Sequence, residues 1–264
     1  MNVSHTNIKV QKQKEHFEAV SEDYYEATQH PNCIEFNRLI WSYFLQRHRE
    51  ILPKGASVLE PMCGHGIAMG HLADNLHSNF QYTGFDYSEP LVDVARQRMP
   101  GGHVFVQDVT TFEPTKQYDL IFLAGGLHHV YEQTEEVLTR LRHALAPGGH
   151  MLSAEPTYHN VLYNKIGGII YKRSEKFEHE SEQRYGLPEL NGCYKGAGFT
   201  IVDQCYPGLI AYVIAVSAFC FPRFCIGSPR FIRLLTKAER PMYHSWLGRK
   251  LSFSTMTLLK NDQG

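Results

Sequence analysis

The chain has 264 residues, of which 43% are hydrophobic and 20% are charged, and it carries a formal net charge of −1. This length and balance predict one globular α/β domain with insertions and exclude fibrous and disordered classes. With 26 basic against 27 acidic residues and no compact basic run, the chain lacks the positive field that collects phosphate backbones. Nucleic acid is therefore not expected as a partner.

Six cysteines are scattered along the chain without the paired spacing of a zinc site, and neither H-E-x-x-H nor C-x-x-C occurs. The sequence therefore predicts no metal site. The segment from Met1 to His16 lacks the apolar core of a secretory signal, which favours a reducing, cytoplasmic location.

The predicted elements begin with apolar residues at helical spacing between residues 11 and 49, which indicate two helices broken near His30–Pro31–Asn32. From residue 57 onward, short β-rich runs alternate with helical patterns. Strands are predicted at 57–60, 82–85, 104–106, 118–123, 151–154, 199–205 and 251–259, and helices at 65–75, 88–99, 133–145 and 187–197. Strands separated by helices require right-handed crossovers, so the predicted fold is a doubly wound, Rossmann-like, seven-stranded and mostly parallel sheet.

Within one domain of residues 1–264, we expect a helical cap (1–50) and a ligand-binding core (51–155). Two insertions (156–198 and 207–250) lie over the carboxyl edge of the sheet, and the last strand is 251–259. The second insertion opens with the apolar run GLIAYVIAVSAFCF, which is too short to span a membrane and lies between two strands of one sheet. A lid or core helix is favoured over a segment lying on a membrane surface, because no basic amphipathic face accompanies this run.

The run VLEPMCGHG, residues 58–66, places an acid at a strand end and glycines in the following turn, where backbone can approach a nucleotide-like ligand. Gly64, Gly66 and Gly70 could equally serve a dinucleotide or let a helix pack closely. Glu60 would repel a pyrophosphate but can accept the ammonium of a methionine moiety, which favours S-adenosylmethionine over NAD.

Two further acids follow the next two strands. Asp86 can accept both ribose hydroxyls while Tyr87 packs on an adenine ring. Asp108 can accept the adenine amine, while the backbone N–H groups beside it, at Gln107 and Val109, address ring nitrogens. Three acids after three successive strands predict one ligand site.

Taken together, VLEPMCGHG, GFDYSEPLVDVAR, QDV, YDLIFLAGGLHHV and LRHALAPGGHMLSAEP resemble the class I methyltransferase superfamily, in particular its small-molecule group of quinone and natural-product enzymes. The resemblance covers about residues 17–199. It implies that Glu60 lies near the methionine end of the cofactor, that Asp86 binds ribose and that Asp108 faces adenine.

The resemblance also implies that Ala124, Gly125 and Gly126 line the reactive side of the cofactor, and that Tyr24 closes over the methionine end. Met62 departs from the family, which usually has glycine there, so we expect an altered turn. AGGLHHV stands where amino-methylating nucleic-acid enzymes carry an Asn-Pro-Pro-Tyr type loop, which again favours a small-molecule acceptor.

His128 and His129 follow the fourth strand, where an imidazole could take a proton from a hydroxyl or amine nucleophile. His128 is the candidate base; the alternative is that both histidines cap or pack the next helix. Glu155–Pro156 is interpreted as the end of the fifth strand and Cys63 as small packing, without catalytic roles.

The sequence therefore predicts methyl transfer from S-adenosylmethionine to oxygen, nitrogen or carbon of a small, lipophilic or aromatic acceptor, with oxygen favoured. One rival is an NAD-dependent oxidoreductase, against which Glu60 and Asp108 argue. The other is a degenerate methyltransferase fold that serves as a binding or scaffold protein, motivated by Met62.

Overall fold

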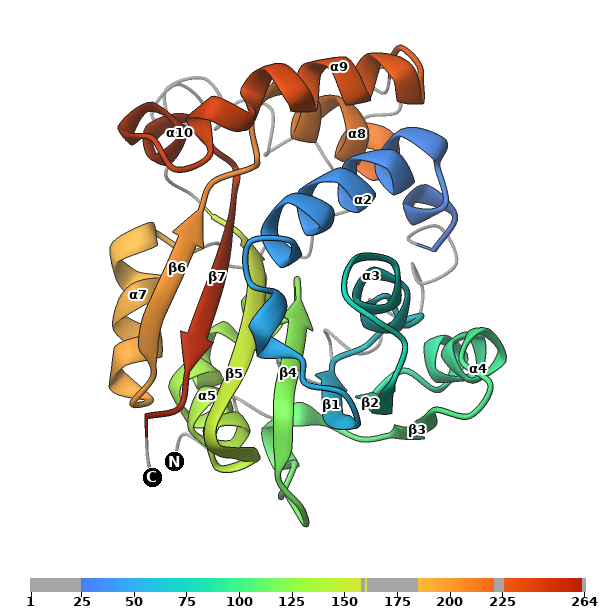
Figure 1. Ribbon diagram of the computed structural model, residues 1–264, viewed down its shortest axis with the longest axis vertical. Coiled ribbons are helices and arrows are strands. Elements are labelled where there is room, and N and C mark those ends of the chain that lie inside the picture. Colours follow the sequence, from blue (N-terminus) through green and yellow to red (C-terminus); the bar gives the residue numbers. More distant parts are fainter. Residues whose placement is uncertain (1–24, 158–159, 161–184, 221–225, 263–264) are drawn as a thin grey trace.

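The computed structural model describes residues 25–157, 160, 185–220 and 226–262, and its centre is a seven-stranded sheet (Figure 1). The strands are β1 (Ala56–Pro61), β2 (Phe80–Asp86), β3 (His103–Val106), β4 (Tyr118–Ala124), β5 (Leu145–Pro156), β6 (Thr200–Cys205) and β7 (Ser254–Lys260). Their order is β3-β2-β1-β4-β5-β7-β6, and every pairing is parallel except those of β7, which runs antiparallel to β5 and β6. The predicted fold class is confirmed.

Helices cover both faces of this sheet. They are α2 (Pro31–Leu45), α3 (Ala68–Asn75), α4 (Glu89–Arg98), α5 (Thr134–His143), α7 (Leu187–Gly196), α8 (Ile210–Cys220), α9 (Pro229–Glu239) and α10 (Trp246–Leu251). Short 3-10 turns are η1 (Arg49–Ile51), η2 (Val109–Thr111), η3 (Leu127–Gln133) and η5 (Arg240–Met242). Neighbouring strand residues point to opposite faces, so Val58 packs with α2, α3 and α4, whereas Leu59 packs with α5 and α7.

A layer made of α2, α8, α9 and α10, here called the cap, lies at the end of the molecule toward which β4 points (Figure 1). α9 packs on α2 and α8. The apolar run after Pro207 forms α8, whose Ala211 and Ala215 are buried in the core, so the expected helix is confirmed. Among the described residues, no helix is both long and apolar enough to cross a membrane.

Three predicted boundaries are wrong by three residues or more. The strand expected from Met151 begins at Leu145. Residues 65–67 belong to a turn, and α3 begins only at Ala68. The strand expected from Leu251 begins at Ser254, because Leu251 still belongs to α10. Ser245 starts that short helix by accepting a hydrogen bond from the Gly248 amide at 3.0 Å.

Candidate functional site

The predicted cofactor residues gather at one edge of the sheet. Parallel strands β1, β2, β3 and β4 end there side by side, with Pro61 paired to Phe85 and Asp86 paired to Val106. The chain reverses its strand order between β1 and β4, which is where open α/β sheets bind ligands. The residues concerned are Glu60, Met62, Gly64, Gly66, Asp86, Tyr87, Gln107, Asp108, Val109, Ala124 and Gly125.

Glu60 holds the loop between β1 and α3. Its carboxylate accepts the backbone N–H groups of Ile67 and Ala68 at 3.2 Å, and Oε2 accepts the Tyr82 hydroxyl at 2.5 Å. Burial raises the pKa of Glu60 to about 7, against these lowering hydrogen bonds. The bonds give Glu60 the role of a loop anchor, and its expected contact with an ammonium group stays a prediction.

Asp86 joins the same loop to the end of β2. Oδ2 accepts the Gly64 amide and Oδ1 accepts the Ser88 amide, each at 2.9 Å. Burial raises the pKa of this carboxyl, while the backbone hydrogen bonds lower it. Each carboxylate oxygen has two lone pairs, so these bonds leave acceptor capacity for the predicted ribose hydroxyls.

The residues after β3 form a compact turn. Asp108 caps η2, because its Oδ1 accepts the backbone N–H of Thr110 at 2.9 Å and the Thr110 hydroxyl at 2.7 Å. Gln107 donates its side-chain amide to the Asp108 carbonyl at 3.0 Å, and Val109 is buried. Asp108 and Tyr87 are half-buried, so both lie at the surface of the edge where adenine is expected.

Four glycines at this edge separate into two kinds. Gly64 and Gly125 have φ values of 51° and 69°, and a Cβ added to either would meet no heavy atom closer than 4.0 Å. Gly66 and Gly126 face close neighbours, Met99 and Met62 respectively. The first pair leaves space beside its α-carbons for a close approach by a ligand, while its amides donate to Asp86 and to the Ala154 carbonyl.

Gly66 shapes the turn between β1 and α3. Its amide donates to the Cys63 carbonyl at 2.8 Å and a Cβ added to it would meet Met99, while its place in the cofactor site stays a prediction.

Met62 adopts a backbone conformation that glycine takes more easily. It is the single non-glycine residue with a left-handed backbone in the described ranges, with φ of 52°. Such a conformation costs roughly 1 to 3 kcal/mol. The Met62 side chain packs against Gly126, and the expected alteration of the turn stays a prediction.

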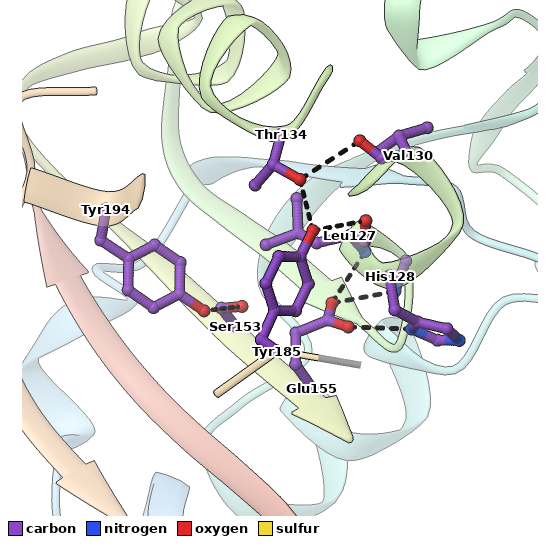
Figure 2. A network of polar contacts seen from close by, with 9 residues as sticks. Leu127, His128, Val130, Thr134, Ser153, Glu155, Tyr185 and Tyr194 are labelled. Carbon is purple, nitrogen blue, oxygen red and sulfur yellow. Dashed lines mark hydrogen bonds and ion pairs between the residues drawn. The ribbon is translucent and has the colours of Figure 1, made fainter. Parts of the chain in front are cut away.

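His128 and Glu155 form a pair at the ends of β4 and β5 (Figure 2). His128 Nδ1 lies 3.0 Å from Glu155 Oε2, while Glu155 Oε1 accepts the amides of Gly126 and Leu127 at 3.0 and 2.9 Å. The Glu155 side chain is fully buried, whereas that of His128 is 16% exposed. Burial raises the pKa of Glu155 to about 7. The His129 ring lies against His128, with centroids 4.0 Å apart.

Glu155 ends β5, as expected, and its side chain also holds the loop after β4. A fully buried glutamate needs partners, and Ala124 pairs with Ala154, so the residues following β4 run past Glu155. An acid in an apolar strand beside the expected position of the two histidines was the available signal.

A second layer of hydroxyls supports the pair (Figure 2). Tyr185 donates to the Leu127 carbonyl at 2.8 Å and also contacts the Thr134 hydroxyl. Tyr194 and Ser153 share a hydrogen bond of 2.7 Å, and Ser153 lies two residues before Glu155 in β5. These buried bonds fix the loop that carries His128.

Tyr24 lies outside the described residues, as does most of the first insertion. Across the described ranges, no group of three or more His, Cys, Asp or Glu side chains is arranged to hold a metal ion.

Residues 58–149 match the profile of a methyltransferase domain family. The chain is 36% identical over 99 residues to a trans-aconitate 2-methyltransferase from Variovorax paradoxus, covering 37% of this chain and 38% of that protein. It is 21% identical over 171 residues to a demethylmenaquinone methyltransferase from Listeria welshimeri, covering 56% and 72%. The chain thus spans from two fifths to just over half of the trans-aconitate relatives it matches.

Solved structures show the same fold over nearly the whole chain. A plantazolicin methyltransferase in complex with a substrate analogue and S-adenosylhomocysteine aligns with a TM-score of 0.61 at 12% identity, covering 98% and 97% of the two chains. A cyclopropane synthase from Mycobacterium tuberculosis aligns equally well, covering 94% and 97%. The sheet order, the carboxyl-edge acids and these matches lead to one conclusion. Residues 58–149 form a methyltransferase domain of the S-adenosylmethionine-dependent class, and the chain as a whole has the fold of the solved methyltransferases.

Proposed function

We propose that this protein transfers the methyl group of S-adenosylmethionine to a nucleophilic atom of a small, lipophilic acceptor, oxygen being favoured over nitrogen and carbon. The observation that carries the proposal is the His128–Glu155 pair, placed at the end of β4 beside the edge that gathers Asp86 and Asp108. The pair supplies a base where the acceptor would meet the cofactor.

Glu155 sets the protonation of His128. When the Glu155 carboxylate accepts a hydrogen bond from His128 Nδ1–H, the proton is held on Nδ1 and Nε2 is the unprotonated ring nitrogen. Nε2 then takes the proton of an acceptor hydroxyl as the oxygen attacks. Bound S-adenosylmethionine supplies an electrophilic methyl group on a sulfonium, so alignment by the protein provides much of the acceleration.

The edge residues have the chemistry to orient this cofactor. Asp86 offers remaining lone pairs for ribose, the half-buried Tyr87 offers a ring for adenine, and Gly64 and Gly125 leave space beside their α-carbons. The names of the relatives support the acceptor class, since trans-aconitate and demethylmenaquinone are small molecules and the second is lipophilic.

The test is calorimetric titration of the full chain with S-adenosylhomocysteine and, separately, with NADH, because it needs no acceptor. We expect micromolar binding of S-adenosylhomocysteine and none of NADH. Binding of NADH alone would favour an oxidoreductase, and binding of neither would favour a scaffold protein. After a positive titration, small hydroxylated and lipophilic acceptors are screened for release of S-adenosylhomocysteine.

A further inference from the structure

The elements of the cap carry most of the large apolar side chains that are exposed. Eight of the ten large apolar side chains exposed among the described residues belong to α2, α8, α9, α10 and the loop before α9. Trp246 in α10 is 71% exposed and Leu234 in α9 is 65% exposed, with Phe231 and Leu247 also exposed. Side chains of this size, grouped at one end of a molecule, indicate an interaction surface.

The exposed side of α9 divides into two strips. At about 100° per residue, Phe231, Leu234 and Ala238 fall on one strip. Arg230, Arg233 and Lys237 fall on the strip beside it, and the opposite side of the helix is buried. A helix with an apolar strip beside a basic one has the pattern of helices that lie in the surface of a bilayer.

The charged residues of the cap favour an anionic partner. From Ile226 to Ser252 the chain has six basic residues, Arg230, Arg233, Lys237, Arg240, Arg249 and Lys250, against the single acid Glu239, which is buried. Arg233 pairs with Glu35 at 2.7 Å, whereas Arg230, Lys237, Arg249 and Lys250 make no ion pair within the described chain. This part of the chain is therefore basic although the whole chain carries −1.

We propose that the cap docks on the surface of an anionic lipid bilayer, with Trp246, Leu247, Phe231 and Leu234 entering the interface and Arg230, Lys237, Arg249 and Lys250 contacting lipid phosphates and acidic headgroups. Tryptophan at the interface level and basic residues beside it are the side chains that such a surface retains. The apolar run itself, α8, carries no basic face, as expected, and the basic amphipathic face belongs to the following helix, α9.

The docking places a bilayer at the end of the molecule where the parallel strands finish, with α2 between α9 and α3 (Figure 1). A lipophilic acceptor could then leave the bilayer close to the catalytic edge. Docking itself does not depend on methyl transfer, so vesicle binding and cofactor titration can fail independently.

The first test is co-sedimentation of the full chain with vesicles of phosphatidylcholine mixed with phosphatidylglycerol, and with vesicles of phosphatidylcholine alone. We expect binding to the anionic vesicles that weakens as salt is raised. The double variant Lys237→Gln/Lys250→Gln should bind at least about tenfold more weakly, given about fivefold for each charge. The matched control Lys54→Gln/Lys195→Gln removes two exposed lysines outside the cap and should bind like wild type.

The second test uses the two tryptophans of the chain, Trp41, which is 2% exposed, and Trp246. Anionic vesicles should shift the emission of Trp246 to shorter wavelength, and the Trp246→Ser variant should lose this shift and bind more weakly. Val202→Ser, which removes an exposed apolar side chain on β6, is the control and should bind normally.

Equal binding of wild type and the double lysine variant, or no binding at low salt, would overturn the proposal. A dimer that Trp246→Ser dissociates, without vesicle binding, would also overturn it and assign the surface to a second copy of this chain.

Discussion

Two loops of this molecule are each held by a buried glutamate, and the two glutamates differ in the further side chain that they contact. Glu60 fixes the loop after β1 and Glu155 fixes the loop after β4; the two residues are 2% and 1% exposed, and each accepts two backbone amides. For each, burial raises the pKa to about 7. The difference is the third partner, because Glu60 meets the buried Tyr82 whereas Glu155 meets the partly exposed His128. A buried carboxylate thus becomes functional through the one side chain it presents to the site.

The largest effect is expected from Glu60→Ala. Removing the carboxylate leaves the amides of Ile67 and Ala68 and the Tyr82 hydroxyl buried without an acceptor. At about 1 to 3 kcal/mol for each such group, we expect the free energy of unfolding to fall by about 3 kcal/mol or more. Urea unfolding measures this, and Glu60→Gln, which keeps one acceptor oxygen, should lose less. An unchanged urea midpoint would show that Glu60 does not hold the loop.

Glu155→Gln should distinguish the effect of Glu155 on His128 from the loop-holding role that it shares with Glu60. The amide oxygen can still accept from Gly126 and Leu127, but its NH₂ group would donate to His128 Nδ1 and place the proton on Nε2. We expect kcat to fall roughly a hundredfold, as for His128→Ala, with little change in S-adenosylhomocysteine affinity. Steady-state kinetics with an identified acceptor measures this. Full activity in both variants would return the pair to a structural role.

Asp86→Ala tests whether the loop after β1 is the one that serves the cofactor. Loss of a charged acceptor should weaken S-adenosylhomocysteine binding by about 1 to 3 kcal/mol. Calorimetry measures the change, with Glu155→Gln as the comparison that should bind normally. Unchanged affinity would refute the ribose assignment.

The pH dependence of turnover should follow Glu155. Below pH of about 7 this carboxyl takes up a proton and ceases to accept from His128 Nδ1, so activity should fall as pH falls. The loss should approach about tenfold per pH unit for a single group. A pH profile of kcat/KM for wild type against Glu155→Gln, which should be flatter, tests it, and identical profiles would contradict the assignment.

The smallest effect concerns the contact that joins the two loops. A Cβ at Gly126 would lie 2.8 Å from Met62 Sδ and 3.0 Å from Leu123 Cδ1, so Gly126→Ala should destabilise by about 1 to 3 kcal/mol through overpacking. Met62→Ala should relieve part of that loss, and the double-mutant cycle in urea should show coupling. Additive effects would mean that the loops do not communicate through this contact.

The sequence allowed the fold and the position of the site to be predicted, because acids and glycines followed successive strands. Asp86, Asp108 and Gly125 all lie at the expected edge. The bonds of Glu60 could not be predicted, since its partners at the start of α3 are backbone amides, which no residue type records. The partners of Glu155 were not anticipated, because they follow β4 and lie far from Glu155 in the sequence.

The cap, too, could be predicted only in part from the sequence. Its apolar run was correctly expected to form a helix, and this helix, α8, buries Ala211 and Ala215. The surface of α9 depends on which side packs on α2, and that is known only from the assembled structure.

The place of β7 has a consequence for biosynthesis. β7 lies between β5 and β6, although residues 254–260 follow every other strand in the chain. While the chain emerges from the ribosome, β1 to β5 can pair in turn, whereas β6 has no neighbour in the sheet until β7 has emerged. Completion of the sheet therefore waits for a strand that is made after all the others in the sheet. A nascent chain that stalls before Ser254 would leave β6 and the open side of β5 exposed to aggregation and to chaperones.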